Sequence, residues 1–145
     1  MAWLKCTFHL PDWKYPLTRR IFIPGAGVAV LVDTVGFIQN LPVKLVESFK
    51  STLEDMTDAH LLLHVVDISD PRYSMHIDEV RKITHELHAE SIPTILVLNK
   101  SDILDKPDRV ENVMKTTQDC VAVSAKKKLN LDGLKSAISA KLAEG

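Results

Sequence analysis

Four short apolar runs, each followed at once by polar residues, constrain the fold of this chain more than any other feature. Runs of strand length that are apolar at nearly every position are typical of strands buried on both faces of a parallel sheet. Between them lie segments whose apolar residues recur at three- and four-residue steps, as in amphipathic helices. We therefore predict an α/β fold in which helices cover both faces of a mostly parallel sheet. The apolar runs are residues 28–32, 61–66, 95–98 and 121–123, and the helical segments include 42–56, 77–87 and 131–142.

Length and composition fit one compact domain. The chain has 145 residues, of which 46% are hydrophobic, and a net charge of −1, so we expect no DNA partner. No apolar run is long enough to span a membrane, and no signal peptide precedes the first run. Cys6 and Cys120 fit no disulfide or metal spacing. We expect a cytoplasmic protein, or a mitochondrial one if the full-length protein carries a transit peptide.

The first fifteen residues fit the pattern poorly. They carry both tryptophans, and Pro11 and Pro16 interrupt any helical or strand period. We expect residues 1–15 to form an atypical segment with less order than the rest. Residues 20–23 then predict a short strand, and Pro24-Gly25-Ala26-Gly27 predicts a hairpin connection into the first apolar run.

The run at 95–98 ends at a polar cluster that suits guanine. The carboxylate of Asp102 can accept two parallel hydrogen bonds from the N1–H and exocyclic amine of guanine, which adenine cannot supply. Asn99 can steady the purine edge and its own loop, and the aliphatic stem of Lys100 can cover the base face. Asn-Lys-x-Asp resembles the base-recognition motif of GTP-binding proteins. The alternative is an ordinary strand-to-helix loop in which Asp102 caps the next helix.

A second polar turn, Ser124-Ala125-Lys126, follows the run at 121–123. Its backbone N–H groups can reach the carbonyl oxygen of guanine, which would reinforce the choice against adenine. The alternative is a simple loop with Ser124 as a helix cap.

A third polar turn, Asp33-Thr34-Val35-Gly36, follows the run at 28–32 and suits a magnesium-phosphate site. A hard cation takes carboxylate and water oxygens, and the exposed N–H of a glycine can bond a terminal phosphate. The alternative is an aspartate-initiated turn with glycine at its fourth position. For Asp67, which ends the run at 61–66, a role in capping or tethering the loop is favoured over ligand binding. His85 and His88 are three residues apart, not the four that a helical zinc motif needs.

These three turns lie at the carboxyl ends of separate predicted strands, which share one edge of a parallel sheet, so they can converge on one nucleotide. Here the chain resembles the translation-factor-related GTPases, specifically the HflX-type members of the Obg-like group. The resemblance runs from about Pro16 to the C-terminus. It rests on Pro-Leu-Thr-Arg-Arg at 16–20, Asp-Thr-Val-Gly-Phe-Ile at 33–38, Leu-Pro at 41–42, Glu-Ser-Phe-Lys-Ser-Thr-Leu-Glu at 47–54, Leu-Leu-His-Val-Val-Asp at 62–67 and Asn-Lys-Ser-Asp at 99–102.

The resemblance implies a three-layer P-loop NTPase-like G domain that binds GTP or GDP and associates with the large ribosomal subunit. One departure is large, because the sequence has no Gly-x-x-x-x-Gly-Lys-Ser/Thr phosphate loop. We therefore expect residues 16–145 to be a partial HflX-type G domain that lacks the first strand, the phosphate loop and the first helix. A gap should then lie beside the strand at 28–32 or the strand at 61–66.

Magnesium binding should be weak or lost. Asp33 would hold Mg²⁺ only through water, and the threonine that would complete the magnesium shell in the family should fall near Trp13. We expect retained guanine recognition, weak binding of GTP or GDP, no catalytic residue and no hydrolysis by this chain alone. The alternative is a non-enzymatic protein-interaction module on a degenerate G-domain fold, which would dock through residues 42–56 or 126–128.

Overall fold

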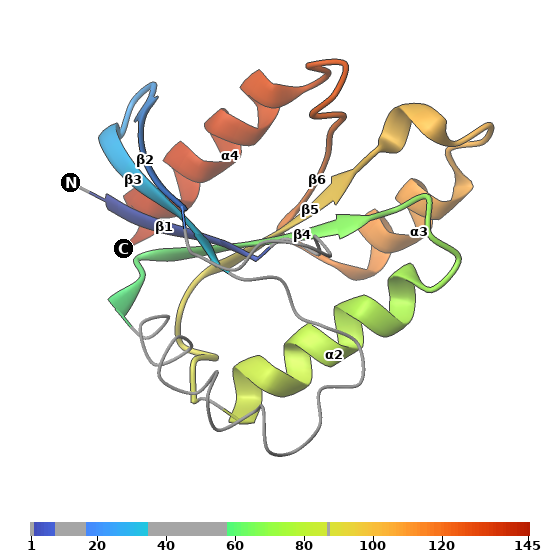
Figure 1. Cartoon of the computed structure of the whole chain (residues 1–145), viewed down its shortest axis with the longest axis horizontal. Coiled ribbons are helices and arrows are strands. Elements are labelled where there is room, and N and C mark those ends of the chain that lie inside the picture. Colours follow the sequence, from blue (N-terminus) through green and yellow to red (C-terminus); the bar gives the residue numbers. More distant parts are fainter. Residues whose placement is uncertain (1, 8–16, 35–57, 87) are drawn as a thin grey trace.

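Six strands form one sheet in the order β2-β3-β1-β4-β5-β6 (Figure 1). This computed structural model describes residues 2–7, 17–34, 58–86 and 88–145; for residues 2–7, 17, 33 and 34 it describes the backbone alone. The strands are β1 (Ala2–Thr7), β2 (Leu17–Ile23), β3 (Gly27–Thr34), β4 (Leu61–Asp67), β5 (Thr94–Asn99) and β6 (Cys120–Ala122). Neighbouring strands pair in parallel except β2 and β3, which are antiparallel.

Helices follow the strands as the sequence predicts. They are α2 (Tyr73–Glu86), the short 3₁₀ helix η2 (Ser101–Ile103), α3 (Asp108–Thr116) and α4 (Leu131–Glu144). The four apolar runs lie in or at the end of β3, β4, β5 and β6, so the predicted fold class is confirmed. The predicted helix at 42–56 lies outside the described residues.

Each face of the sheet packs on its own layer of helices. On one face Ile138 of α4 packs with Leu61 and Leu63 of β4 in a buried cluster. On the other face, where α2 and α3 lie (Figure 1), Ile77 and Val113 pack with further strand residues. Burying one such aliphatic side chain contributes about 1.5–3 kcal/mol. The sheet is thereby fixed between two layers, and its carboxyl edge is a firm base for loops.

The first strand is where the sequence prediction fails. We expected the chain to lack this strand and to leave a gap, but β1 lies between β3 and β4 and pairs in parallel with both. Leu4, for example, is opposite Leu31 on one side and Leu61 on the other. Two neighbouring strands separated by a gap present rows of unpaired N–H and C=O groups. An extended segment between the two strands satisfies both rows through its own backbone N–H and C=O groups. This pairing requires no alternation of polar and apolar side chains, so the sequence gives no periodic signal for it.

The hairpin between β2 and β3 confirms the predicted connection. The amide of Ala26 donates to the carbonyl of Ile23 at 3.0 Å, with Pro24 and Gly25 between them. Gly25 has a φ of 87°, so the turn has proline at its second position and a left-handed glycine at its third, as a type II turn requires.

Candidate functional site

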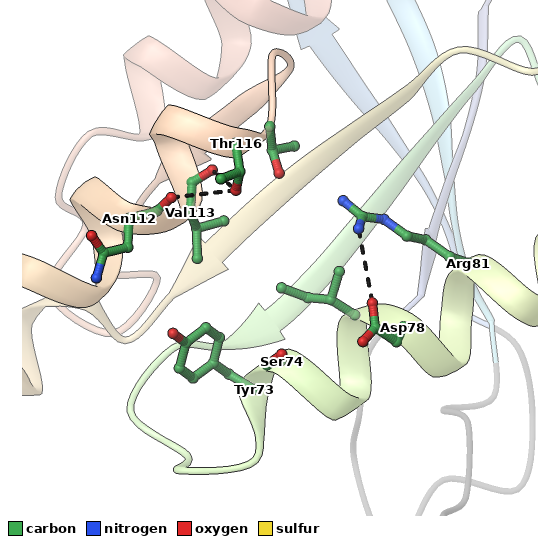
Figure 2. A pocket seen from close by; sticks show the side chains of 9 residues that line it. Tyr73, Ser74, Asp78, Arg81, Asn112, Val113 and Thr116 are labelled. Carbon is green, nitrogen blue, oxygen red and sulfur yellow. Dashed lines mark hydrogen bonds and ion pairs between the residues drawn. The ribbon is translucent and has the colours of Figure 1, made fainter.

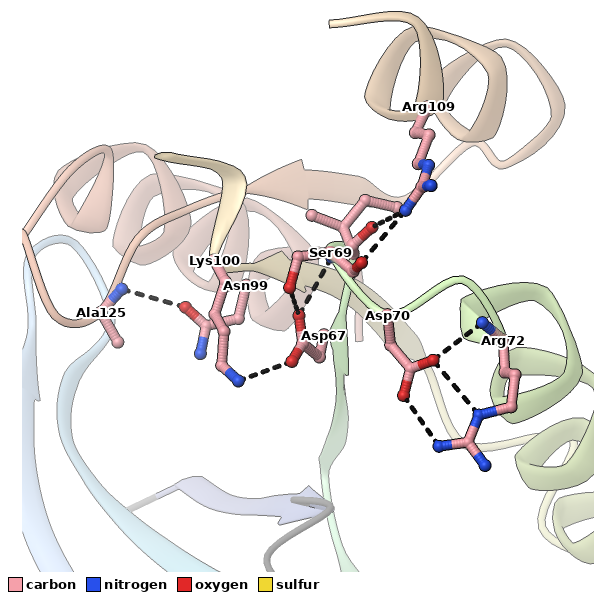
Figure 3. Close-up of polar contacts among 9 residues, drawn as sticks. Asp67, Ser69, Asp70, Arg72, Asn99, Lys100, Arg109 and Ala125 are labelled. Atoms are coloured by element: carbon pink, nitrogen blue, oxygen red, sulfur yellow. Dashed lines mark hydrogen bonds and ion pairs between the residues drawn. The ribbon is translucent and has the colours of Figure 1, made fainter. Parts of the chain in front are cut away.

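Two of the three predicted turns meet at the carboxyl edge of the sheet (Figure 3). Asn99 ends β5, and its Oδ1 accepts a hydrogen bond from the backbone N–H of Ala125 at 3.0 Å. The strands β5 and β6 are paired, with Leu98 opposite Ala122, so their following loops begin side by side. The segments 99–102 and 124–126 therefore form one structural unit, called here the paired-loop site.

Lys100 has a left-handed backbone, with φ 62° and ψ 30°. A non-glycine residue pays about 1–2 kcal/mol for this conformation. Bonds on both sides impose it: the Asn99 carbonyl accepts from the Ile68 amide at 3.1 Å, and the Val123 carbonyl accepts from the amide and hydroxyl of Ser101 at 3.1 and 2.9 Å. Backbone strain that is imposed in this way is common at ligand sites.

Asp102 lies in η2 directly after this turn. Its side chain is 11% exposed, and its Oδ2 is 3.7 Å from the Nζ of Lys127. A hydrogen bond from the Ser124 hydroxyl lowers the pKa of Asp102, and Lys127 lowers it further. The carboxylate is thus ionised at neutral pH and acts as an acceptor only.

The structure contradicts one part of the alternative, that Asp102 and Ser124 cap the helices α3 and α4. The helix α3 begins at Asp108 after Pro107, with no capping side-chain hydrogen bond, so Asp102 does not cap it. The helix α4 begins at Leu131 with Asn130 at its cap position, so Ser124 does not cap that helix.

Ser124 is the buried link of the paired-loop site. It is 1% exposed, and its hydroxyl accepts a hydrogen bond from the Lys127 amide at 3.3 Å while it bonds Asp102. Its backbone exchanges two bonds with Leu129, at 3.1 and 2.9 Å, which close the loop. Ala125 and Lys126 are exposed at the tip of this closed loop. The loop is therefore tied down at its base and open at its tip.

Asp67 tethers its loop, as the sequence predicts, and also reaches the paired-loop site. Its Oδ1 accepts from the amide and hydroxyl of Ser69 at 3.0 and 2.6 Å, and its Oδ2 lies 2.5 Å from the Nζ of Lys100 (Figure 3). Partial burial alone would raise the pKa of Asp67, but the bonds from Lys100 and Ser69 together lower it. Arg109 of α3 donates to the Ser69 carbonyl at 3.1 Å and so holds the same loop from the far side. Sequence reasoning missed the contact with Lys100, although Asp67 and Asn99 are opposite each other in parallel strands.

The predicted phosphate and magnesium turn is only partly described. The backbone of Asp33 and Thr34 ends β3, opposite Cys6 and Thr7 of β1, and so reaches the same carboxyl edge. Val35 and Gly36 lie outside the described residues. Among the side chains that the structure describes, no group of three or more His, Cys, Asp or Glu can hold a metal ion.

The sequence after β1 cannot build a glycine-rich cradle. In P-loop proteins the motif follows a strand directly and leads into a helix. Here the nine residues 8–16, Phe-His-Leu-Pro-Asp-Trp-Lys-Tyr-Pro, contain no glycine and connect β1 to β2. A central strand is thus present without the phosphate-binding sequence that normally accompanies it.

Two cavities lie on the α2 and α3 face of the sheet. One, of about 320 Å³, has Tyr73, Asp78 and Arg81 of α2 and Asn112 and Thr116 of α3 in its lining (Figure 2). No residue of the paired-loop site lines that cavity. The other, of about 390 Å³, includes buried His64 of β4 in its wall.

Within the described residues, none of the helices combines the length and the apolar character needed to cross a membrane.

Comparison with known sequences finds one matching family and relatives that share one description. Residues 15–100 match the family described as 50S ribosome-binding GTPase. The chain is 42% identical over 127 residues to GTPase HflX of Spirochaeta thermophila, which covers 83% of this chain and 29% of the relative. It is 48% identical over 90 residues to GTPase HflX of Escherichia coli, which covers 62% of this chain and 21% of the relative. The chain thus spans less than a third of the length of these relatives.

Comparison with solved structures supports the fold. A GTP-binding protein from Sulfolobus solfataricus in complex with GDP aligns with a TM-score of 0.80 at 24% identity, covering 99% of this chain and 53% of that protein. A variant of Era from Aquifex aeolicus bound to GDP and AlF4⁻ aligns with a TM-score of 0.68 at 20% identity, covering 99% and 57%. At these identities the likeness concerns the fold alone.

Proposed function

This chain belongs to the 50S ribosome-binding GTPase family and is of the HflX type, and from that premise we propose that it recognises guanine nucleotides chiefly by their base. The proposal assigns base recognition to the paired-loop site: Asn99, Lys100 and Asp102 with Ser124, Ala125 and Lys126. It assigns no catalytic residue.

The observation that carries this proposal is the bonding between the two loops. Ser124 bonds the Asp102 carboxylate, and Ala125 bonds the Asn99 amide oxygen. An acceptor-only carboxylate and neighbouring loop amides are thereby fixed relative to each other by bonds within the chain. Such preorganisation lowers the cost of binding, because the side chains are ordered in advance.

The arrangement matches guanine and opposes adenine. Asp102 accepts from the N1–H and the exocyclic amine of guanine, and the Lys126 amide donates to its carbonyl oxygen, because the Ala125 amide is already bonded to Asn99. Adenine has a lone pair at N1, which a carboxylate repels, and carries an amine where the Lys126 amide needs an acceptor. The stem of Lys100 covers one face of the ring.

Phosphate and magnesium binding should be weak. The family's phosphate loop supplies consecutive backbone amides, and this sequence has no such loop. Asp33 and the Gly36 amide are what remains for the phosphates, with Asp33 reaching Mg²⁺ through water. Hydrolysis needs a clamped γ-phosphate, a cation and a positioned water, so we propose that this chain alone does not hydrolyse GTP.

Competition against fluorescent GDP tests this proposal. Unlabelled GDP and GMP should displace the probe at similar concentrations, because affinity comes from the base, whereas ADP should not displace it. Asp102→Asn should lose this discrimination between GDP and ADP. Asp105→Asn is the matched control and should keep it, since Asp105 is an exposed carboxylate three residues from Asp102. Equal displacement by ADP would contradict base recognition, and magnesium-dependent phosphate release lost in Asp33→Ala would contradict the predicted lack of hydrolysis.

Association with the large ribosomal subunit is part of the same proposal. It is supported by the family description and by three exposed lysines, 126–128, at the tip of the 124–129 loop. Binding through phosphate contacts weakens as salt rises, because bound counterions are released. Sedimentation with 50S subunits at 50 and 200 mM salt should show this loss, and a variant with alanine at all three lysines should sediment less at 50 mM.

A further inference from the structure

We propose that Asp67 is a positioning residue for guanine binding, which acts by holding the Lys100 side chain where its stem covers the base. The inference rests on the function proposed above. Asp67 belongs to neither predicted guanine motif and comes from a different strand, β4. What brings it to the site is the register of the sheet, in which Asp67 is opposite Asn99.

The two oxygens of Asp67 have separate partners. Oδ1 accepts from the amide and hydroxyl of Ser69 at 3.0 and 2.6 Å, and Oδ2 lies 2.5 Å from the Nζ of Lys100. The Ser69 carbonyl is itself bonded by Arg109 at 3.1 Å. The carboxylate is therefore fixed by its own loop through Oδ1, and Oδ2 fixes the lysine (Figure 3).

This ion pair fixes the position of the Lys100 side chain and contributes little to folding stability. The side chains of Lys100 and Asp67 are 50% and 31% exposed, and ion pairs with such access to water contribute little to folding. A lysine side chain that is not paired samples many rotamers, and ordering it on binding costs affinity. Asp67 removes that cost before the nucleotide arrives, since the left-handed backbone and the ion pair together hold both ends of the Lys100 side chain.

A double-mutant cycle tests whether Asp67 acts through Lys100. Asp67→Asn keeps the size of the side chain and an acceptor for Ser69 but removes the charge that holds Lys100. We expect it to weaken fluorescent GDP binding about threefold to tenfold, which corresponds to ordering one long side chain. In a Lys100→Met background, where the stem remains but the charge is gone, Asp67→Asn should cause no further loss. An equal loss in both backgrounds would overturn the proposal.

Asp70→Asn is the matched control. Asp70 lies in the same loop and loses the same charge, but it bonds Arg72, at 2.8 and 3.3 Å, on the side of the loop away from Lys100 (Figure 3). The GDP affinity of the Asp70→Asn protein should stay within twofold of the wild-type affinity. A loss equal to that of Asp67→Asn would show a general charge effect and would overturn the proposal.

A measurement without nucleotide separates this inference from the proposed function. The acylation rate of each lysine by acetic anhydride can be followed by mass spectrometry on the intact, ligand-free chain. Lys100 should react more slowly than exposed Lys126, and Asp67→Asn should raise its rate severalfold while Asp70→Asn does not. An unchanged Lys100 rate in Asp67→Asn would overturn the inference, whereas the expected rates in a protein that binds no GDP would contradict the proposed function alone.

Discussion

At the scale of single residues, Ser124 connects the stability of the paired-loop site to its chemistry. Its hydroxyl bonds both the Asp102 carboxylate and the Lys127 amide from a position that is 1% exposed. If the buried Ser124 hydroxyl were removed, the Asp102 carboxylate and the Lys127 amide would lose a hydrogen-bond partner that replaces water. The free energy of leaving such groups unpaired exceeds the net contribution of the hydrogen bond itself.

Ser124→Ala should therefore reduce both folding stability and guanine affinity. We expect a loss of about 1–2 kcal/mol in the free energy of unfolding and about a fivefold weaker GDP affinity, because Asp102 loses the bond that orients it. Urea denaturation and GDP titration measure the two effects. Ser91→Ala, at an exposed position, should change neither. A Ser124→Ala protein with wild-type affinity would show that Asp102 does not depend on this bond.

His64 gives the fold a pH dependence unrelated to the guanine site. Burial, together with the nearby charges of Arg81 and His76, lowers the pKa of His64 from 6.5 to about 4, and its side chain is 7% exposed. The unfolded chain therefore binds a proton between these pH values that the folded chain does not. Stability is full above pH 6.5 and is lost as the pH falls toward 4.

Between pH 6.5 and pH 5, above the pKa of ordinary carboxylates, the loss should be about 1.5 kcal/mol. His64→Gln, which cannot titrate, should show a flat profile over this range. Urea denaturation at several pH values measures it. An equally steep profile in His64→Gln would assign the effect to another group.

At the scale of elements, the β2–β3 hairpin depends on two left-handed glycines. Gly25 and Gly27 have φ values of 87° and 85°. A Cβ at position 27 would meet no atom within 4 Å, whereas a Cβ at position 25 would lie 2.7 Å from the Oγ of Ser139 on α4. Position 27 thus tests backbone strain alone, and position 25 adds a steric contact with α4.

Gly27→Ala should destabilise the chain by about 1 kcal/mol and Gly25→Ala by about 1–2 kcal/mol. Combining Gly25→Ala with Ser139→Ala should recover the steric part of the stability lost in Gly25→Ala. Urea midpoints report all three variants. If Gly25→Ala were no worse than Gly27→Ala, the turn would be shown to shift away from α4 at little cost.

Two of the strands with a strong apolar pattern, β5 and β6, bring the predicted turns at 99–102 and 124–126 together as expected. The runs at 61–66 and 95–98 became buried strands because burial on both faces requires apolar side chains throughout, whereas the run at 28–32 became a strand with Val28 exposed. The meeting of Asn99 with Ala125 follows from parallel pairing of β5 with β6. The contact between Asp67 and Lys100 was not predicted, because it depends on side-chain positions that strand order alone does not specify.

At the scale of the whole molecule, β1 changes the description of the chain. Sequence analysis expected a sheet interrupted at its centre, whereas Ala2–Thr7 completes the order β2-β3-β1-β4-β5-β6. Backbone pairing with β3 and β4 fixes this placement, and such pairing leaves no periodic signal in the hydrophobic pattern. The chain then combines the complete strand order with a sequence that has no phosphate loop, which is why we separate base recognition from phosphate binding.

The most direct test of this account is the base preference of nucleotide binding in the wild type and in Asp102→Asn. Xanthine carries a carbonyl where guanine has its exocyclic amine, so it offers one donor and one acceptor to an amide side chain and repels a carboxylate. The wild type should prefer GDP to xanthosine diphosphate by at least about tenfold, which is the worth of one bond to a charged acceptor. Asp102→Asn should reverse that preference, and Asp105→Asn should retain it. A variant Asp102→Asn that still prefers GDP would show that the paired-loop site does not read the base.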